Sequence, residues 1–166
     1  MTIAYDAAVA LSISLASLAS SADFTAGQES AEVDWTAVLK DDAQISGRIM
    51  VGTSPAANTS IIGWLWGHHT SLGSSPLDVL DGTDSAETIT SAGILATLFA
   101  PTPLFVLSVS ATTSNRSYPF SARSVASFFG GIMPAFWGLY VAHNTGVNLN
   151  STSGNHEIKY RPVNWS

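Results

Sequence analysis

Apolar and polar residues alternate along most of this chain in short segments. Alternation with a period of two is clear in residues 33–38 and recurs in residues 104–109. This period is typical of β-strands that bury one face. Short apolar or alternating segments predict further strands, at residues 9–15, 45–51, 61–66, 136–141 and 158–160.

Residues that favour turns separate these segments. A polar loop with Pro55 and Asn58 covers residues 52–59, and residues 111–118 are expected to form a polar bend. Many short strands with frequent turns predict an all-β fold, a single-domain β-sandwich with a jelly-roll-like antiparallel arrangement over residues 1–166. Residues 67–93 form a long connection, which either has a role of its own or is packed by its own side chains.

The most aromatic run, residues 136–141, predicts a well-buried strand at the centre of the core. The apolar residues before it predict one short helical turn near residues 124–129, which ends at Gly130 and Gly131. This glycine pair has neither the spacing nor the lysine of a phosphate-binding loop.

The apolar residues 7–18 suggest a signal sequence at first sight. However, the first basic residue is Lys40, and Asp6 precedes the apolar run. The period of two at Val9, Leu11, Ile13 and Leu15 favours a strand instead. No apolar run has the length of about 20 residues needed to span a bilayer, so no membrane partner is expected.

Composition favours a protein that buries its surface in an assembly. Only 11% of the residues are charged and 46% are hydrophobic, so Ser, Thr, Asn and Gly must cover much of the surface. The net charge is −6, and the six basic residues are scattered in the sequence, which argues against a nucleic-acid partner. The chain has no cysteine for a disulfide or a thiolate site.

Two groups of residues are candidate metal ligands, the histidines and an acidic loop. His68 and His69 are adjacent on a predicted strand, so their side chains should point to opposite faces and not bind one ion. His143 and His156 lack a metal-binding context and are expected, like the adjacent pair, to be solvent-facing or hydrogen-bonded loop residues.

The acidic loop of residues 78–87 is the best calcium candidate, with Asp78, Asp81, Asp84 and Glu87. Their spacing does not match a calcium-binding loop, and residues 84–87 also fit a capped helix start. Both interpretations stay open, and no metal-ligating residue is assigned.

Trp64 and Trp66 lie on one face of a predicted strand and could stack on a sugar ring. Aromatic residues on such strands more often belong to a core or an interface. Ser residues are abundant, but no G-x-S-x-G motif is present. The sequence therefore predicts no catalytic residue, no enzyme activity and no cofactor.

Several segments together resemble the small virion structural proteins of tailed bacteriophages, most closely a capsid decoration (cement) protein. The segments that carry this resemblance are residues 52–59, 78–90, 112–120, 124–131, 133–134, 136–138, 143–149 and 153–163.

The resemblance implies a protein that binds the outer capsid surface and bridges subunits of the major capsid protein, often as a homotrimer. It also implies that residues 1–28 can serve as an extended N-terminal arm that pairs with a neighbour. A tail or fibre component and a carbohydrate-binding β-sandwich are the alternatives.

Overall fold

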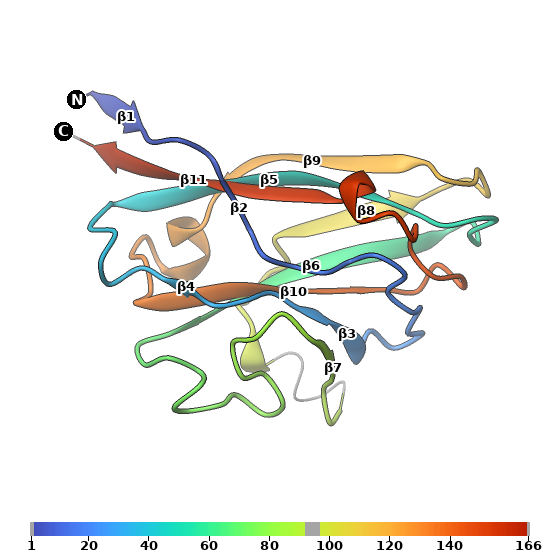
Figure 1. Ribbon diagram of the computed structural model, residues 1–166, viewed down its shortest axis with the longest axis horizontal. Helices are drawn as coiled ribbons and strands as arrows, with labels where there is room; N and C mark the ends of the chain where they lie inside the picture. The colour runs from blue at the N-terminus through green and yellow to red at the C-terminus, as the bar shows by residue number, and fades with distance from the viewer. Residues whose placement is uncertain (1, 92–96, 166) are drawn as a thin grey trace.

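Two antiparallel β-sheets pack face to face in the computed structural model, which describes residues 2–91 and 97–165 (Figure 1). Sheet A has the strand order β1-β11-β5-β9, and β2 also pairs with β11. Its strands are β1 (Ile3–Tyr5), β2 (Val9–Ala10), β5 (Asp42–Met50), β9 (Ser117–Ser124) and β11 (Glu157–Trp165).

Sheet B has the order β7-β3-β10-β6-β8, and β4 pairs with β10. Its strands are β3 (Ala26–Glu29), β4 (Val33–Asp34), β6 (Thr59–His68), β7 (Ala86–Thr88), β8 (Phe105–Val109) and β10 (Phe136–His143). The chain crosses from one sheet to the other between β2 and β3, β4 and β5, β5 and β6, β8 and β9, β9 and β10, and β10 and β11. This confirms the predicted all-β, antiparallel β-sandwich.

The predicted helical turn is also present. The 3-10 helix η1 (Ala126–Phe129) ends at Gly130, whose φ of 74° is in the left-handed region that glycine favours. A second 3-10 turn, η2 (Ser153–Asn155), precedes β11. No helix in the described residues is long and apolar enough to cross a membrane.

Two predicted strands are much shorter than expected. Residues 33–38 contribute only β4, because the Asp34 carboxylate accepts hydrogen bonds from the Thr36 backbone N–H and hydroxyl, which turn the chain. Residues 9–15 contribute only β2, although burial still alternates from Leu11 to Leu15.

Strand β9 occupies a segment that was expected in part to be a polar bend. It is the edge strand of sheet A, and its Pro119 is exposed. A proline is tolerated at an edge, because its missing N–H leaves no gap inside the sheet. Tyr118 and Phe120 are nevertheless buried, so a period of two was present but was masked by Ser and Arg.

The main core lies between the sheets. Its large members include Ile45 and Ile49 of β5, Leu65 of β6 and Trp137 of β10, all with no exposed surface. The Trp35 ring meets the Trp137 ring edge-on at 6.2 Å between centroids. The aromatic run at residues 136–141 is therefore central to the core, as predicted.

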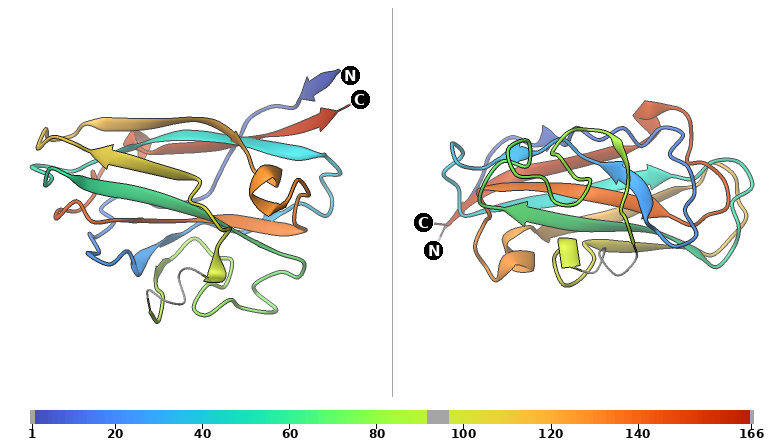
Figure 2. Two further views of the ribbon diagram at one scale, coloured as in Figure 1. Left: turned by 180° about the vertical axis from the view of Figure 1, so that it is seen from behind. Right: turned by 90° about the horizontal axis from the view of Figure 1, so that it is seen from below.

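A third layer covers the outer face of sheet B. The connection between β6 and β8 folds back beneath the sheet in Figure 1, and both views in Figure 2 agree. Its side chains form a second apolar cluster with those of β6 and β10: Leu72, Leu80, Ile89 and Phe99 with Trp64, Trp66, Tyr140 and Ala142. The long connection is thus packed by its own side chains. Gly93, which belongs to it, lies outside the described residues.

Residues after β2 close one open edge of the sandwich. Leu11, Leu15 and Leu18 are buried in the main core, and the Leu11 N–H donates to the Ile158 carbonyl at 2.9 Å. Within the predicted arm of residues 1–28, the side chains of residues 2–10 form a continuous exposed stretch.

Candidate interaction surfaces

The adjacent histidines lie at the end of β6. Their rings stack at 4.6 Å between centroids, so the expectation that they point to opposite faces was wrong. The strand ends at His68, and the chain turns there: the Thr70 N–H donates to His68 Nδ1 at 3.2 Å. Alternation of side chains between the two faces holds only within a strand, and His69 lies beyond His68, the last paired residue of β6.

The other two histidines belong to the framework. His143, the last residue of β10, is fully buried, with Nδ1 3.0 Å from Thr145 Oγ1 and Nε2 3.0 Å from the Leu18 carbonyl oxygen. It is therefore not the loop residue that was expected. His156 is partly buried, with Nε2 2.8 Å from the Asn150 carbonyl oxygen. Burial lowers the pKa of both imidazoles.

The acidic loop does not start a helix. Ala86–Thr88 forms strand β7, which pairs with β3 at the edge of sheet B. Asp84 caps nothing within its own loop. Its carboxylate accepts hydrogen bonds from the Ser14 N–H at 2.8 Å and from Gln28 Nε2 at 2.7 Å, and so ties the third layer to the N-terminal region.

Glu29 of β3 fastens the same loop to sheet B. Its side chain is fully buried, and its two oxygens accept hydrogen bonds from the backbone N–H groups of Asp81 at 3.1 Å and Gly82 at 3.0 Å. Glu32 acts similarly, because its Oε2 accepts a hydrogen bond from the Leu72 N–H at 2.7 Å. Sequence reasoning missed both residues, since each lies between 40 and 53 positions from its partners and in a different layer.

Glu29, Asp81 and Glu87 bring three carboxylates together. One oxygen of each lies within 4.8 Å of the others, the single such group of potential metal ligands among the described residues. Burial, then the charges of Asp81 and Glu87, raise the pKa of Glu29 to about 7, although the two N–H donors oppose this. The cluster can therefore hold a proton near neutral pH, and its clearest role is to attach the third layer.

Trp64 and Trp66 cannot form a sugar platform in this fold. Trp66 has no exposed surface and Trp64 has 9%, because the third layer covers both. The Trp64 ring stacks on Phe99 at 5.9 Å between centroids. The alternative interpretation, that these residues are core, is the one that the structure supports.

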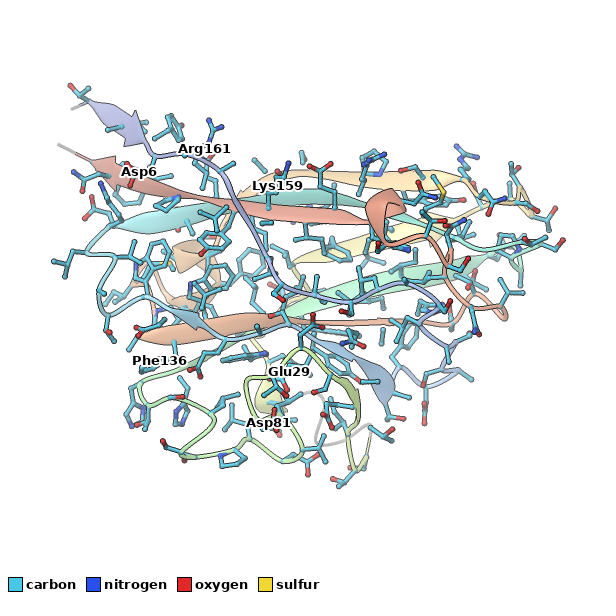
Figure 3. All side chains as sticks on the ribbon, in the orientation of Figure 1. Asp6, Glu29, Asp81, Phe136, Lys159 and Arg161 are labelled. Carbon is cyan, nitrogen blue, oxygen red and sulfur yellow. The ribbon has the colours of Figure 1, made fainter. Side chains whose placement is uncertain are left out.

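Charges that are scattered in sequence are segregated in space. Five of the six basic residues lie on sheet A or directly before one of its strands: Arg48, Arg116, Arg123, Lys159 and Arg161. Eight of the twelve acidic residues lie in or near β3, β4 and the third layer: Asp23, Glu29, Glu32, Asp34, Asp78, Asp81, Asp84 and Glu87. Figure 3 shows Lys159 and Arg161 on the sheet A side and Glu29 and Asp81 on the other.

Among the described residues, no layer covers the outer face of sheet A as the connection between β6 and β8 covers sheet B. Along β11, Ile158 points into the core while Lys159 and Arg161 are exposed. Two shallow hollows of about 330 and 310 Å³ adjoin on this face and share Ser46 and Lys159. Glu157 forms ion pairs with Lys159 and Arg48, and the rest of the lining is mostly small or uncharged.

Comparisons of the chain with protein-family models, with curated proteins and with solved structures found no match.

Proposed function

We propose that this protein is a virion structural protein that binds the outer surface of a capsid and stabilises the shell by bridging neighbouring capsid subunits. Its partners would be the major capsid protein and further copies of itself, with a homotrimer favoured. The proposal rests on the segments that resemble decoration proteins and on a composition with only 11% charged residues.

The open face of sheet A is the observation that carries the proposal. One side of the sandwich is covered by a packed layer of the chain's own residues, and the other presents a broad strand surface with shallow hollows. A rigid sheet face of this kind suits a large, flat partner. Lys159 and Arg161 make it the basic side of an acidic molecule, which favours approach to an acidic surface.

A bridging role needs no strong single contact. A protein that binds only the assembled shell stabilises that shell by mass action. Contacts made by several linked copies add through their effective concentration. Weakly charged surfaces that contact two neighbouring subunits are sufficient for this mechanism.

A tail or fibre component is the second candidate, and one observation favours it. The first and last described strands, β1 and β11, pair with each other and project together from one end of the sandwich (Figure 1). A domain that is attached at one pole, as at the tip of a fibre, has this geometry.

Charge reversal on sheet A tests the proposal. Shells of the virus that encodes the chain, prepared without it, are mixed with the wild type, Arg161→Glu or Arg116→Glu. The guanidinium of Arg116 lies over the Tyr118 ring at 5.4 Å, and this residue lies outside both hollows, so its variant is the matched control.

We expect Arg161→Glu to lower occupancy on the shells at least severalfold, and Arg116→Glu to retain it. Wild-type protein that leaves the shells bare would refute the shell-binding role. Binding to tails alone would select the second candidate.

A further inference from the structure

Apolar side chains are exposed unevenly on this molecule. Seven large hydrophobic residues of the described chain are exposed, and six of them come from the terminal strands or from the loops before β5 and β10: Ile3, Tyr5, Val9, Leu39, Ile132 and Trp165. The seventh, Val106, lies on β8 at an edge of sheet B. Leu39 is 85% exposed and Ile132 is 76% exposed, which is high for residues of their size.

Four of these residues make one continuous surface. Trp165 lies opposite Ile3 in the pairing of β11 with β1. Trp165 also lines a hollow of about 480 Å³ together with Leu39, Ile132 and Met133. We call the surface formed by these four residues (Ile3, Leu39, Ile132 and Trp165) and the half-buried Met133 the end surface.

An unpaired strand edge borders the end surface. Strand β1 is the last strand of sheet A, with a strand neighbour on one side only in the described chain, and all three of its residues are exposed. An antiparallel edge can pair with an identical edge, because the same pattern of donors and acceptors is complementary to itself after a two-fold rotation.

Charges around the end surface do not oppose contact between two copies. The Lys40 ammonium pairs with the Asp6 carboxylate at 3.2 Å, and the Asp41 carboxylate accepts a hydrogen bond from the Trp165 N–H at 2.6 Å. Elsewhere the acidic residues of two copies with a net charge of −6 each would repel. This end is therefore a favourable place for like molecules to meet.

The exposed apolar area is a large part of what a stable interface between two copies would bury. A fully exposed aromatic side chain presents about 150–250 Å². Scaled by the exposed fractions, the end surface presents on the order of 500 Å² of apolar side chain. A stable interface buries about 800 Å² per partner, and pairing of β1 edges would add backbone area to the apolar contact.

We propose that the end surface is where one copy of this chain binds another, with Trp165, Leu39 and Ile132 as the apolar contacts. This deepens the self-association part of the proposed function and rests on it, but two-fold pairing of β1 edges would join the copies as a dimer in place of the favoured homotrimer. The test measures the mass of the purified protein in solution, without shells. Self-association can therefore be absent while shell binding is present, and shell binding can be absent while self-association is present.

Sedimentation velocity across a wide range of concentration tests it on three proteins: the wild type, the double variant Leu39→Ser/Ile132→Ser, and Val106→Ser. Val106 is 54% exposed and lies outside the end surface, so its variant controls for loss of a surface hydrophobic residue. All three should give the same circular dichroism, because none of the substituted side chains is buried.

We expect the wild type and Val106→Ser to self-associate and the double variant to weaken association at least tenfold. Trp165 reports the contact independently. It is 43% exposed, and the other four tryptophans are at most 9% exposed, so Trp165 is the tryptophan that acrylamide can reach most easily. Quenching of tryptophan fluorescence by acrylamide should therefore fall as the wild type assembles and buries Trp165. A wild type that is monomeric at every concentration, or a double variant that assembles like the wild type, would overturn the inference.

Discussion

Protonation of Glu29 should contribute more to the stability of this β-sandwich at mildly acidic than at neutral pH. The Glu29 pKa is about 7 in the folded protein, against 4.5 for an unperturbed carboxyl, because the side chain is buried beside Asp81 and Glu87. A folded-state pKa above the unfolded value means that the folded state binds the proton more tightly. The stabilisation is complete below about pH 4.5 and is lost as pH rises through 7.

The size of the effect follows from the two pKa values. Each unit of difference corresponds to 1.36 kcal/mol, so the Glu29 contribution amounts to about 3 kcal/mol between the two limits. Glu29→Gln has the shape of the protonated acid and does not titrate. Its amide nitrogen cannot accept the hydrogen bond that one of the two backbone N–H groups makes to Glu29, so the variant carries a cost in stability that is the same at every pH. We expect the stability of the variant relative to the wild type to rise by up to about 3 kcal/mol between pH 4.5 and pH 8.

Urea unfolding followed by tryptophan fluorescence, at a series of pH values, measures this difference. His143 and His156 act in the opposite sense, because their lowered pKa values cost stability as pH falls below 6.5. They are present in both proteins, so the difference between wild type and variant removes their effect. Glu157→Gln is the control, since this exposed carboxyl pairs with Lys159, which lowers its pKa. A Glu29→Gln curve parallel to the wild type at every pH would refute the reasoning.

Two further substitutions test the packing, both by urea unfolding. A Cβ at Gly138 would lie 2.2 Å from the buried Trp66 ring, so Gly138→Ala should lower the free energy of unfolding by about 1–3 kcal/mol or more. Gly154→Ala is the control, because a Cβ there meets open space and should change the free energy of unfolding little. Equal losses in the two variants would contradict the close contact at Gly138. Asp42 accepts a hydrogen bond from the Ala126 N–H at 2.8 Å and so holds η1 on sheet A. Asp42→Ala should lower the free energy of unfolding by about 1–3 kcal/mol. Asp42→Asn keeps a side-chain acceptor and should retain most of that stability. An asparagine variant as unstable as the alanine variant would count against this role of Asp42.

The fold was predictable because its signal is local. A period of two and frequent turn residues identify most of β5, β6, β8 and β10, and three of the nine residues of β11. The failures have local causes as well. Asp34 turns the chain in the middle of an alternating segment, and the Ser and Arg residues of β9 hide its buried Tyr118 and Phe120.

The surfaces were far less predictable, because they depend on contacts between distant segments. The acidic loop was visible in the sequence, but its attachment to Glu29 was not, since 52 positions separate Glu29 from Asp81. The basic residues look scattered until β5, β9 and β11 are placed in one sheet. Trp64 and Trp66 seemed available to a ligand only because the third layer that covers them was expected as a loop of unspecified position.

Locating the chain on virus particles tests the central claim most directly. Under the proposed function a virus encodes the chain, and the measurement is a cryo-electron microscopy reconstruction of the particles of that virus. The account predicts density for the β-sandwich on the outer surface of the shell, in copies that contact neighbouring capsid subunits, with sheet A toward the shell. Density confined to the tail, or particles that lack the chain, would contradict it.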